Sequence, residues 1–161
     1  YPIITKEGDK SVPLANIIIT CTDNTRSRLD LWRFLKKYRE YKNNDEKAPI
    51  YWMDFGNAQT TGQVLVGNIR SKISQPASSE YLPMPRMNVI TEEVSYSTIR
   101  EEDSGPSCSL AEALRKQDLF INSMLAQIGC DILWRMFREG RTFYRGAYLN
   151  LGTLRVNPIP V

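Results

Sequence analysis

The chain has 161 residues, 42% of them hydrophobic and 24% charged, and its 21 basic and 18 acidic side chains give a net charge of +3. This composition excludes disordered and fibrous proteins, and the length predicts one domain over residues 1–161. The absence of histidine excludes histidine-based triads, histidine metal sites and imidazole acid–base catalysis. The small basic excess does not indicate binding of nucleic acid.

The three cysteines, Cys21, Cys108 and Cys130, contain no C-x-x-C spacing, so neither a disulfide framework nor a zinc knuckle is indicated. No apolar run approaches the roughly 20 residues that a membrane-spanning helix needs, and no charged and then apolar leader opens the chain. A cytoplasmic protein without membrane contacts is therefore expected.

The first ordered elements are expected to be a strand and a helix. Residues 1–15 are polar and are interrupted by prolines, which indicates a loose lead-in. The β-branched run at residues 17–20 predicts a strand that stops at the polar turn formed by residues 22–24. The amphipathic segment from residue 25 to about residue 42 predicts a helix, and Trp32 on its apolar face is predicted to lie in the core.

Asp23 allows two interpretations. In open α/β sheets, ligands bind beyond the carboxyl ends of the strands, so a carboxylate that directly follows a strand can belong to a ligand site. Alternatively, Asp23 or Asn24 caps the next helix by accepting a hydrogen bond from one of its first N–H groups. The local pattern taken alone favours the cap.

Residues 50–55 and 63–66 read as two strands, and the short connection between them predicts an antiparallel hairpin. Residues 68–106 are rich in proline, serine and acidic residues, with one short helix expected at residues 89–96. A connection this long is usually functional or disordered, and the sequence leaves both possibilities open.

A long helix is expected from Ser109, whose spacing to Glu112 forms a capping box. The helix should end near Arg138 and Gly140, in the order typical of helix C-termini. Gly129 indicates a close approach of another backbone or a break, because glycine costs about 1 kcal/mol inside a helix. The apolar residues of this helix recur every three or four positions: Leu110, Leu114, Ile121, Leu125, Ile128, Ile132 and Met136.

Two closing strands are predicted at residues 142–149 and 153–157, with Pro158 and Pro160 ending their pairing. Six aromatic side chains could cover an interface, although most are expected to belong to the core: Trp32, Trp52, Trp134, Phe137, Tyr144 and Tyr148. Cys21 at a strand end and Cys130 in an apolar helix are also predicted to be core residues.

Two motifs carry a family resemblance. Thr22-Asp23-Asn24, followed by Arg26 and Arg28, resembles the T-D-N-x-x-x-R signature of the ThiF/MoeB and ubiquitin-activating adenylation family. Residues 106–110, Pro-Ser-Cys-Ser-Leu, resemble the P-x-C-T/S-L/I crossover segment of ubiquitin-activating relatives. With the tail at residues 146–151 and 157–159, the chain most closely resembles bacterial PRTRC-system ThiF proteins, over residues 17–34, 50–67 and 105–161.

The resemblance implies an α/β fold with a Rossmann-like mixed sheet, partly parallel and with antiparallel hairpins, packed on helices. Residues 16–67 would form a strand, a helix and a hairpin, residues 68–106 a crossover-type loop, and residues 107–161 a long helix and a closing hairpin. The nine glycines form no G-x-G-x-x-G turn. The chain is therefore expected to be the C-terminal part of such a domain, without its N-terminal nucleotide-binding half.

The implied activity is ATP-dependent adenylation of the C-terminal carboxylate of a ubiquitin-like or sulfur-carrier protein. ATP and Mg²⁺ are the implied cofactors, without zinc, and a homodimer is the implied assembly. Asp23 would hold Mg²⁺ against the phosphates, because hard cations choose oxygen ligands, and would act both in catalysis and in cofactor binding. Asn24 and Arg26 are the other cofactor-binding candidates, although their expected role is rather to fix the turn and the following helix. Without the glycine-rich segment, this chain is expected to be inactive alone.

Cys108 is the second catalytic candidate. It lies just before the capped start of a predicted helix, where the helix dipole favours a thiolate. A thiolate there could attack an acyl adenylate and form a thioester, or the cysteine could simply pack in place. The alternative function for the whole chain is a non-catalytic interaction module that keeps the fold and binds a partner through the long loop.

Overall fold

The computed structural model describes residues 15–39, 48–73, 75, 77–80, 82–96 and 117–161. The elements in these ranges follow the chain as β1 (Ile17–Thr20), α1 (Thr25–Leu35), the 3₁₀ turn η1 (Lys36–Tyr38), β2 (Tyr51–Asn57), β3 (Thr61–Asn68), α2 (Ile90–Glu93), α4 (Ile121–Glu139), β4 (Tyr144–Asn150) and β5 (Arg155–Pro160).

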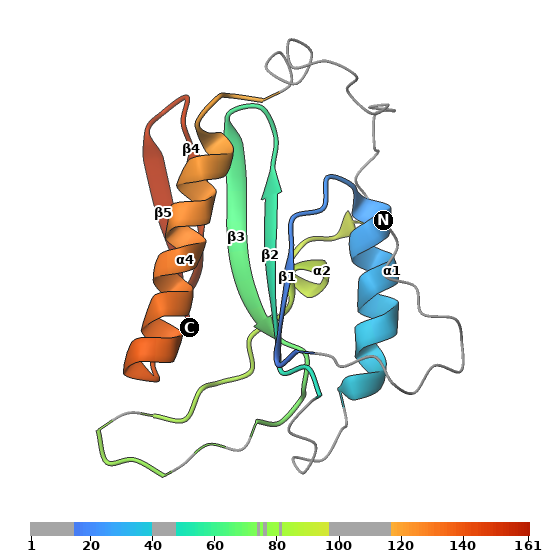
Figure 1. The fold of residues 1–161 in the computed structure, drawn as a ribbon, viewed down its shortest axis with the longest axis vertical. Coiled ribbons are helices and arrows are strands. Elements are labelled where there is room, and N and C mark those ends of the chain that lie inside the picture. Colours follow the sequence, from blue (N-terminus) through green and yellow to red (C-terminus); the bar gives the residue numbers. More distant parts are fainter. Residues whose placement is uncertain (1–14, 40–47, 74, 76, 81, 97–116) are drawn as a thin grey trace.

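The strands form one five-stranded sheet in the order β1-β2-β3-β4-β5 (Figure 1). Strands β1 and β2 are parallel, and every following pair is antiparallel. The predicted hairpin is confirmed as β2 and β3, closed by a hydrogen bond of 2.8 Å from the N–H of Ala58 to the carbonyl of Thr61. The chain is thus an α/β protein with a mixed sheet.

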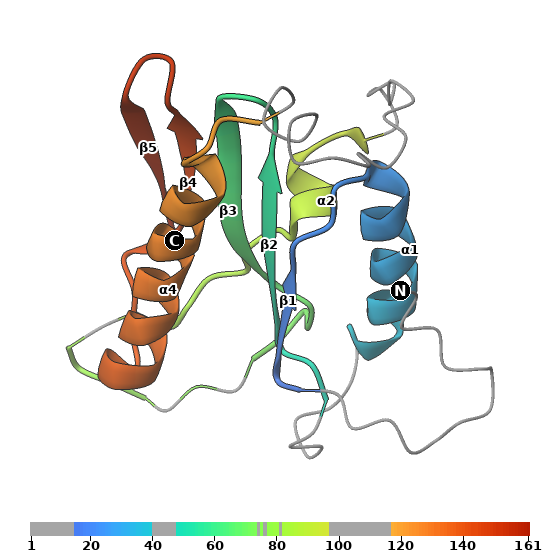
Figure 2. The same ribbon diagram turned by 45° about the horizontal axis from the view of Figure 1, so that its top comes forward.

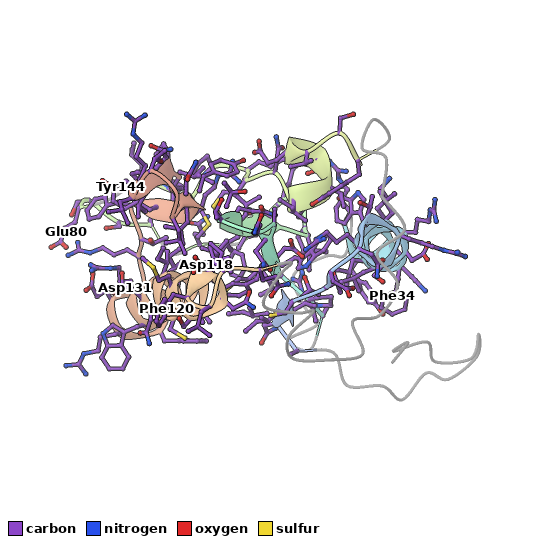
Figure 3. The ribbon with its side chains drawn as sticks, turned by 90° about the horizontal axis from the view of Figure 1, so that it is seen from above. Phe34, Glu80, Asp118, Phe120, Asp131 and Tyr144 are labelled. Atoms are coloured by element: carbon purple, nitrogen blue, oxygen red, sulfur yellow. The ribbon has the colours of Figure 1, made fainter. Side chains whose placement is uncertain are left out.

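Helices cover both faces of this sheet, and the alternation of side chains along β2 divides the core between them. Trp52 packs in one cluster with Trp32 and Leu35 of α1, whereas Met53 packs in another with Ile132 of α4. Figure 2 shows α1 and α4 on either side of the strands, and Figure 3 shows α4 and α2 on opposite sides. The predicted core position of Trp32 is confirmed, and its ring stacks on that of Trp52 at a centroid distance of 6.2 Å.

The long helix begins later than predicted. Helix α4 starts at Ile121, and residues 117–120 form a turn, so the prediction of one continuous helix is wrong here. Asp118 explains this turn, because its carboxylate accepts the N–H of Phe120 at 2.9 Å and its own N–H donates to the carbonyl of Gln59 at 2.7 Å. The capping box at Ser109, with Leu110 and Leu114, lies outside the described residues. The helix ends at Gly140 with a φ of 66°, as predicted.

Gly129 is buried in α4, where the ring of Phe55 from β2 lies against it. A Cβ atom at position 129 would lie 2.3 Å from Cζ of Phe55, which is far inside van der Waals contact. Both predicted alternatives at Gly129 are therefore wrong: the close neighbour is a side chain rather than a backbone, and the helix continues without a break.

Gly129→Ala is expected to destabilise the protein. Overpacking costs about 1–3 kcal/mol, which exceeds the gain of about 1 kcal/mol from replacing glycine in a helix. Adding Phe55→Leu should recover most of the loss. Urea denaturation followed by circular dichroism measures both effects, with Cys130→Ala as the control at the next, exposed position. A stabilised Gly129→Ala variant would contradict the packing argument.

The closing hairpin of β4 and β5 also differs in one detail from the prediction. Pro158 pairs with Ala147 and Pro160 with Tyr144, so the prediction that these prolines end the pairing is wrong. Strand β5 lies at the edge of the described sheet, and an edge strand tolerates proline because a missing N–H can face away from its neighbour.

Cys21 and Cys130 are exposed, so their predicted core positions are wrong. Cys21 lies just after the end of β1, and Cys130 follows the buried Gly129 on the outward side of α4. The prediction that the core takes most of the six aromatic residues is also wrong: Trp32 and Trp52 are buried, whereas the exposed ones are Trp134, Phe137, Tyr144 and Tyr148.

The described part of residues 68–106 is tied to the sheet. The side-chain amide of Gln75 donates to the carbonyl of Met84 and accepts the N–H of the same residue. The N–H of Asn68, at the end of β3, donates to the carbonyl of Met87 at 2.9 Å. The short helix expected at residues 89–96 is present as α2, over fewer residues. No helix in the described ranges is both long enough and apolar enough to cross a membrane.

Candidate functional site

The hydrogen bonds of the polar turn after β1 show whether Asp23 or Asn24 caps the following helix. Asn24 is the N-cap of α1, since its backbone is extended and its side-chain oxygen accepts the N–H of Ser27 at 2.7 Å. Asp23 is exposed and accepts a hydrogen bond of 3.1 Å from the side-chain amide of Asn24. Because Asn24 makes the cap, the carboxylate of Asp23 is available at the carboxyl end of β1.

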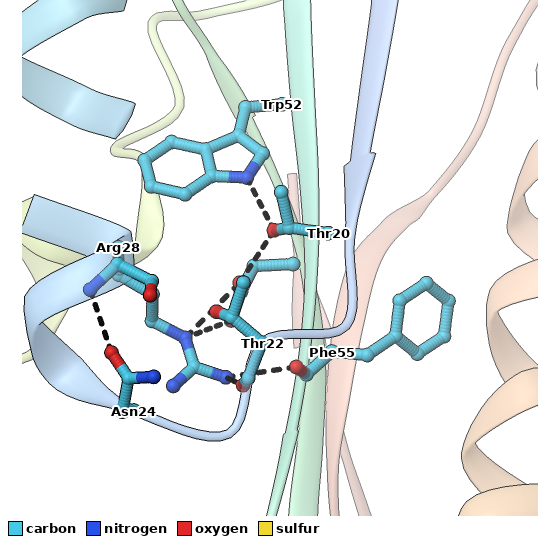
Figure 4. Close-up of polar contacts among 8 residues, drawn as sticks. Thr20, Thr22, Asn24, Arg28, Trp52 and Phe55 are labelled. Carbon is cyan, nitrogen blue, oxygen red and sulfur yellow. Dashed lines mark hydrogen bonds and ion pairs between the residues drawn. The ribbon is translucent and has the colours of Figure 1, made fainter. Parts of the chain in front are cut away.

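Arg28, one turn into α1, fastens this turn to the sheet (Figure 4). Its Nε atom donates to both carboxylate oxygens of Asp54, at 3.1 and 2.9 Å. Its Nη2 atom donates to the carbonyl of Thr22 at 2.5 Å and to that of Phe55 at 2.9 Å. One buried guanidinium thereby joins the turn after β1 to the end of β2.

Asp54 is the buried partner of Arg28 and is 0% exposed. It accepts the hydroxyl of Thr20 at 2.6 Å, and that hydroxyl in turn accepts the indole N–H of Trp52 at 2.7 Å. Burial raises the pKa of Asp54, while the charge of Arg28 and the hydrogen bonds from Thr20 and Arg28 partly offset this shift. The network holds the ends of β1 and β2 together.

The sequence interpretation did not assign Asp54. The available signal was a single carboxylate inside the apolar strand at residues 50–55, because a buried carboxylate is rarely found without a charged or hydrogen-bonding partner. Arg28 belongs to the predicted motif, and the structure gives it a positioning role rather than a contact with the cavity beside Asp23.

Asp23 faces a cavity of about 300 Å³ between the end of β1 and the start of α4. The volume is at the lower end of the range for small-molecule sites. The lining mixes polar and apolar side chains: Cys21, Thr22, Asp23, Phe55, Asn57, Gln117, Asn122, Leu125 and Ala126. None of these described lining residues is basic, so phosphate groups bound here would need cations from elsewhere.

A single exposed carboxylate fits one kind of metal site. Mg²⁺ is commonly held by one or two carboxylates together with phosphate oxygens and water. Within the described ranges, no three acidic or thiol side chains gather to form a metal-binding group. Asp23 therefore fits Mg²⁺ only as a shared ligand, with a bound phosphate group and water completing the coordination.

The other predicted site residues are not brought to this cavity. Arg26 is 89% exposed on α1, where it lies 3.8 Å from the carboxylate of Asp30, and it is not part of the lining. Asn24 lies beside Asp23 and acts as the helix cap. Cys108 lies outside the described residues.

Three features of the described structure bear on function: a mixed α/β sheet, a capped turn at the carboxyl end of β1, and one exposed carboxylate beside a cavity. The sequence matches no protein-family model and no curated protein.

Proposed function

We propose that this chain is part of a ThiF/MoeB-like adenylating domain that activates the C-terminal carboxylate of a ubiquitin-like or sulfur-carrier protein with ATP and Mg²⁺. The observation that carries the proposal is the position of Asp23 at the carboxyl end of β1, exposed beside a cavity and not used as the helix cap. The sheet adds support, because the resemblance implies a parallel start followed by antiparallel hairpins.

Asp23 suits this chemistry for an electrostatic reason. A bound nucleotide concentrates negative charge, and Mg²⁺ held by a carboxylate and the phosphates neutralises it. Arg28 and Asn24 would keep that carboxylate in place, since they fix the turn from both sides. The phosphate-binding cations that the described lining lacks would come from polypeptide outside the described residues.

The edges of the sheet indicate where such polypeptide could attach. Strand β1 consists of Ile-Ile-Ile-Thr, without charge or proline, and Ile19 is 51% exposed. Apolar runs of this kind are typical of interior strands in parallel sheets, whereas natural edges are protected by charges and prolines. The opposite edge, β5, carries such protection in Arg155, Pro158 and Pro160. Further parallel strands would therefore pair beside β1.

The test is ATP–pyrophosphate exchange with a panel of candidate carrier proteins. It compares this chain with a version extended by the upstream residues of the natural protein. Exchange in the extended version alone would support an adenylating enzyme whose phosphate-binding part lies outside this chain. No exchange in either version, with both folded and the panel broad, would reject adenylation in favour of an interaction module that keeps the fold.

Cys108→Ala is expected to leave this exchange unchanged while removing any thiol-sensitive adduct between enzyme and carrier, because thioester formation follows adenylation. Gel electrophoresis with and without a reducing thiol detects the adduct. Cys130→Ala is the control, since Cys130 is the exposed cysteine of α4. An adduct that survives in Cys108→Ala would exclude Cys108 as the acceptor.

The proposal includes a homodimer. Trp134 and Phe137 are 63% and 74% exposed, and a separation of three residues places them on one side of α4. Replacing both by glutamate is expected to shift a dimer to a monomer in analytical ultracentrifugation, because charges at an apolar contact remain unpaired. An unchanged sedimentation coefficient would place any dimer contact elsewhere.

A further inference from the structure

A second and larger cavity, of about 560 Å³, lies on the α1 and α2 side of the sheet. It extends from Thr25 at the start of α1 and Tyr96 after α2 to Asn157 on β5. The volume is within the usual range of small-molecule sites. Asn57 is the one residue that it shares with the cavity beside Asp23, so the two cavities adjoin at the end of β2.

Arg28 lines this cavity with hydrogen-bonding capacity that the described residues leave unused. The residue is 6% exposed, and its Nε and Nη2 atoms make the bonds to Asp54, Thr22 and Phe55. The remaining nitrogen, Nη1, has no hydrogen-bond partner among the described residues, although a guanidinium offers five N–H donors. The guanidinium also lies over the ring of Tyr96, which is part of the same lining, at 6.0 Å from its centroid.

The rest of the lining indicates the charge of a suitable ligand. Arg28 is the one charged side chain among the described residues of this wall, and Thr25 contributes the N-terminal end of an 11-residue helix. Both features favour an anion. Because Asp54 already balances Arg28, a singly charged carboxylate fits better than a doubly charged phosphate. The amides of Asn57, Gln63 and Asn157 can donate to and accept from the body of that ligand.

We propose that this cavity binds a small organic carboxylate with a hydrogen-bonding body, whose carboxylate accepts hydrogen bonds from Nη1 of Arg28. The ligand can be a free carboxylic acid or the C-terminus of a short peptide. This inference goes beyond adenylation and does not depend on it, because none of its observations involves Asp23.

The test is an NMR titration of the full chain with triglycine, triglycine amide and acetate, which follows the backbone amides of Gln63 and Tyr96. Triglycine is expected to bind at least about tenfold more tightly than its amide, because the amide lacks the charged acceptor. Equal binding of the two peptides, or no response to triglycine or acetate, would overturn the proposal. If acetate binds with the same affinity as triglycine, the ligand is a free carboxylic acid. If acetate binds with lower affinity, the ligand is a peptide terminus.

Two variants of β5 provide a matched pair. Asn157 lines the cavity, so the ring of Asn157→Phe is expected to fill its opening and abolish triglycine binding. Val156, the preceding residue, is 49% exposed and does not line the cavity, so Val156→Phe should bind as the unmodified chain does. Loss of binding in Val156→Phe alone would place the ligand elsewhere and overturn the assignment.

Discussion

Arg28→Met is expected to lower the free energy of unfolding by about 3–5 kcal/mol at neutral pH, because it leaves the carboxylate of Asp54 buried without its cation. The side chains of both residues are almost fully buried, and Arg28 also satisfies the carbonyls of Thr22 and Phe55. Urea denaturation at pH 7 measures the loss. The turn that carries Asp23 should loosen as well, since Arg28 connects it to β2.

The loss should depend on pH in a defined direction. Burial raises the pKa of Asp54, and removing Arg28 removes the charge that lowers it, so the pKa in the variant rises further above its unfolded value. The pKa of an unfolded aspartate is about 4. A carboxyl group whose folded pKa is raised above this value contributes its full stability at pH values below the unfolded pKa, and this contribution is lost as the pH rises through the folded pKa. Arg28→Met should therefore differ least from the unmodified protein near pH 4 and most at pH 7.

Two comparisons separate the buried pair from a general effect of charge. Arg26→Met removes the same charge from the exposed side of α1 and should change stability by less than about 0.5 kcal/mol. Combining Arg28→Met with Asp54→Leu should be less damaging than Arg28→Met alone, because no charge then stays buried without a partner. A double variant less stable than Arg28→Met would contradict this account.

Elements with a local signal were predictable from the sequence. The β-branched run of β1 and the αL glycine after α4 depend on neighbouring residues, and both were predicted at the right place. The start of α4 was not, because the N–H of Asp118 bonds to Gln59 in the β2–β3 turn, and no local pattern reveals such a distant partner. The exposure of Cys130 was missed because periodicity alone did not place it on the outward side of α4.

In the candidate site, too, the features with a local signal were predictable and those that depend on distant residues were not. The sequence places a polar turn after β1 and offers two residues for the cap, and the structure assigns the cap to Asn24. The pair of Arg28 and Asp54 joins residues 26 positions apart, so it depends on how α1 packs against β2. The larger cavity also draws its lining from five separate elements and the segments beside them, and no short motif describes such a site.

Asp23→Ala in the extended protein is expected to reduce ATP–pyrophosphate exchange by roughly 10²–10³-fold, a loss typical of removing one group that stabilises developing charge. Stability should change little, because Asp23 is exposed and Asn24 keeps its bond to Ser27. Asp23→Asn should be almost as inactive, since the amide can still accept from Asn24 but carries no charge for Mg²⁺.

Asp30→Ala is the matched control for Asp23. It removes an equal charge from the exposed side of α1, where Asp30 pairs with Arg26 and Arg33, and it should leave exchange unchanged. Raising the concentration of Mg²⁺ should recover part of the activity of Asp23→Asn, because a weakened metal site fills at higher metal concentration. Full exchange in Asp23→Ala would remove Asp23 from the chemistry and leave its turn as a helix cap held by Arg28.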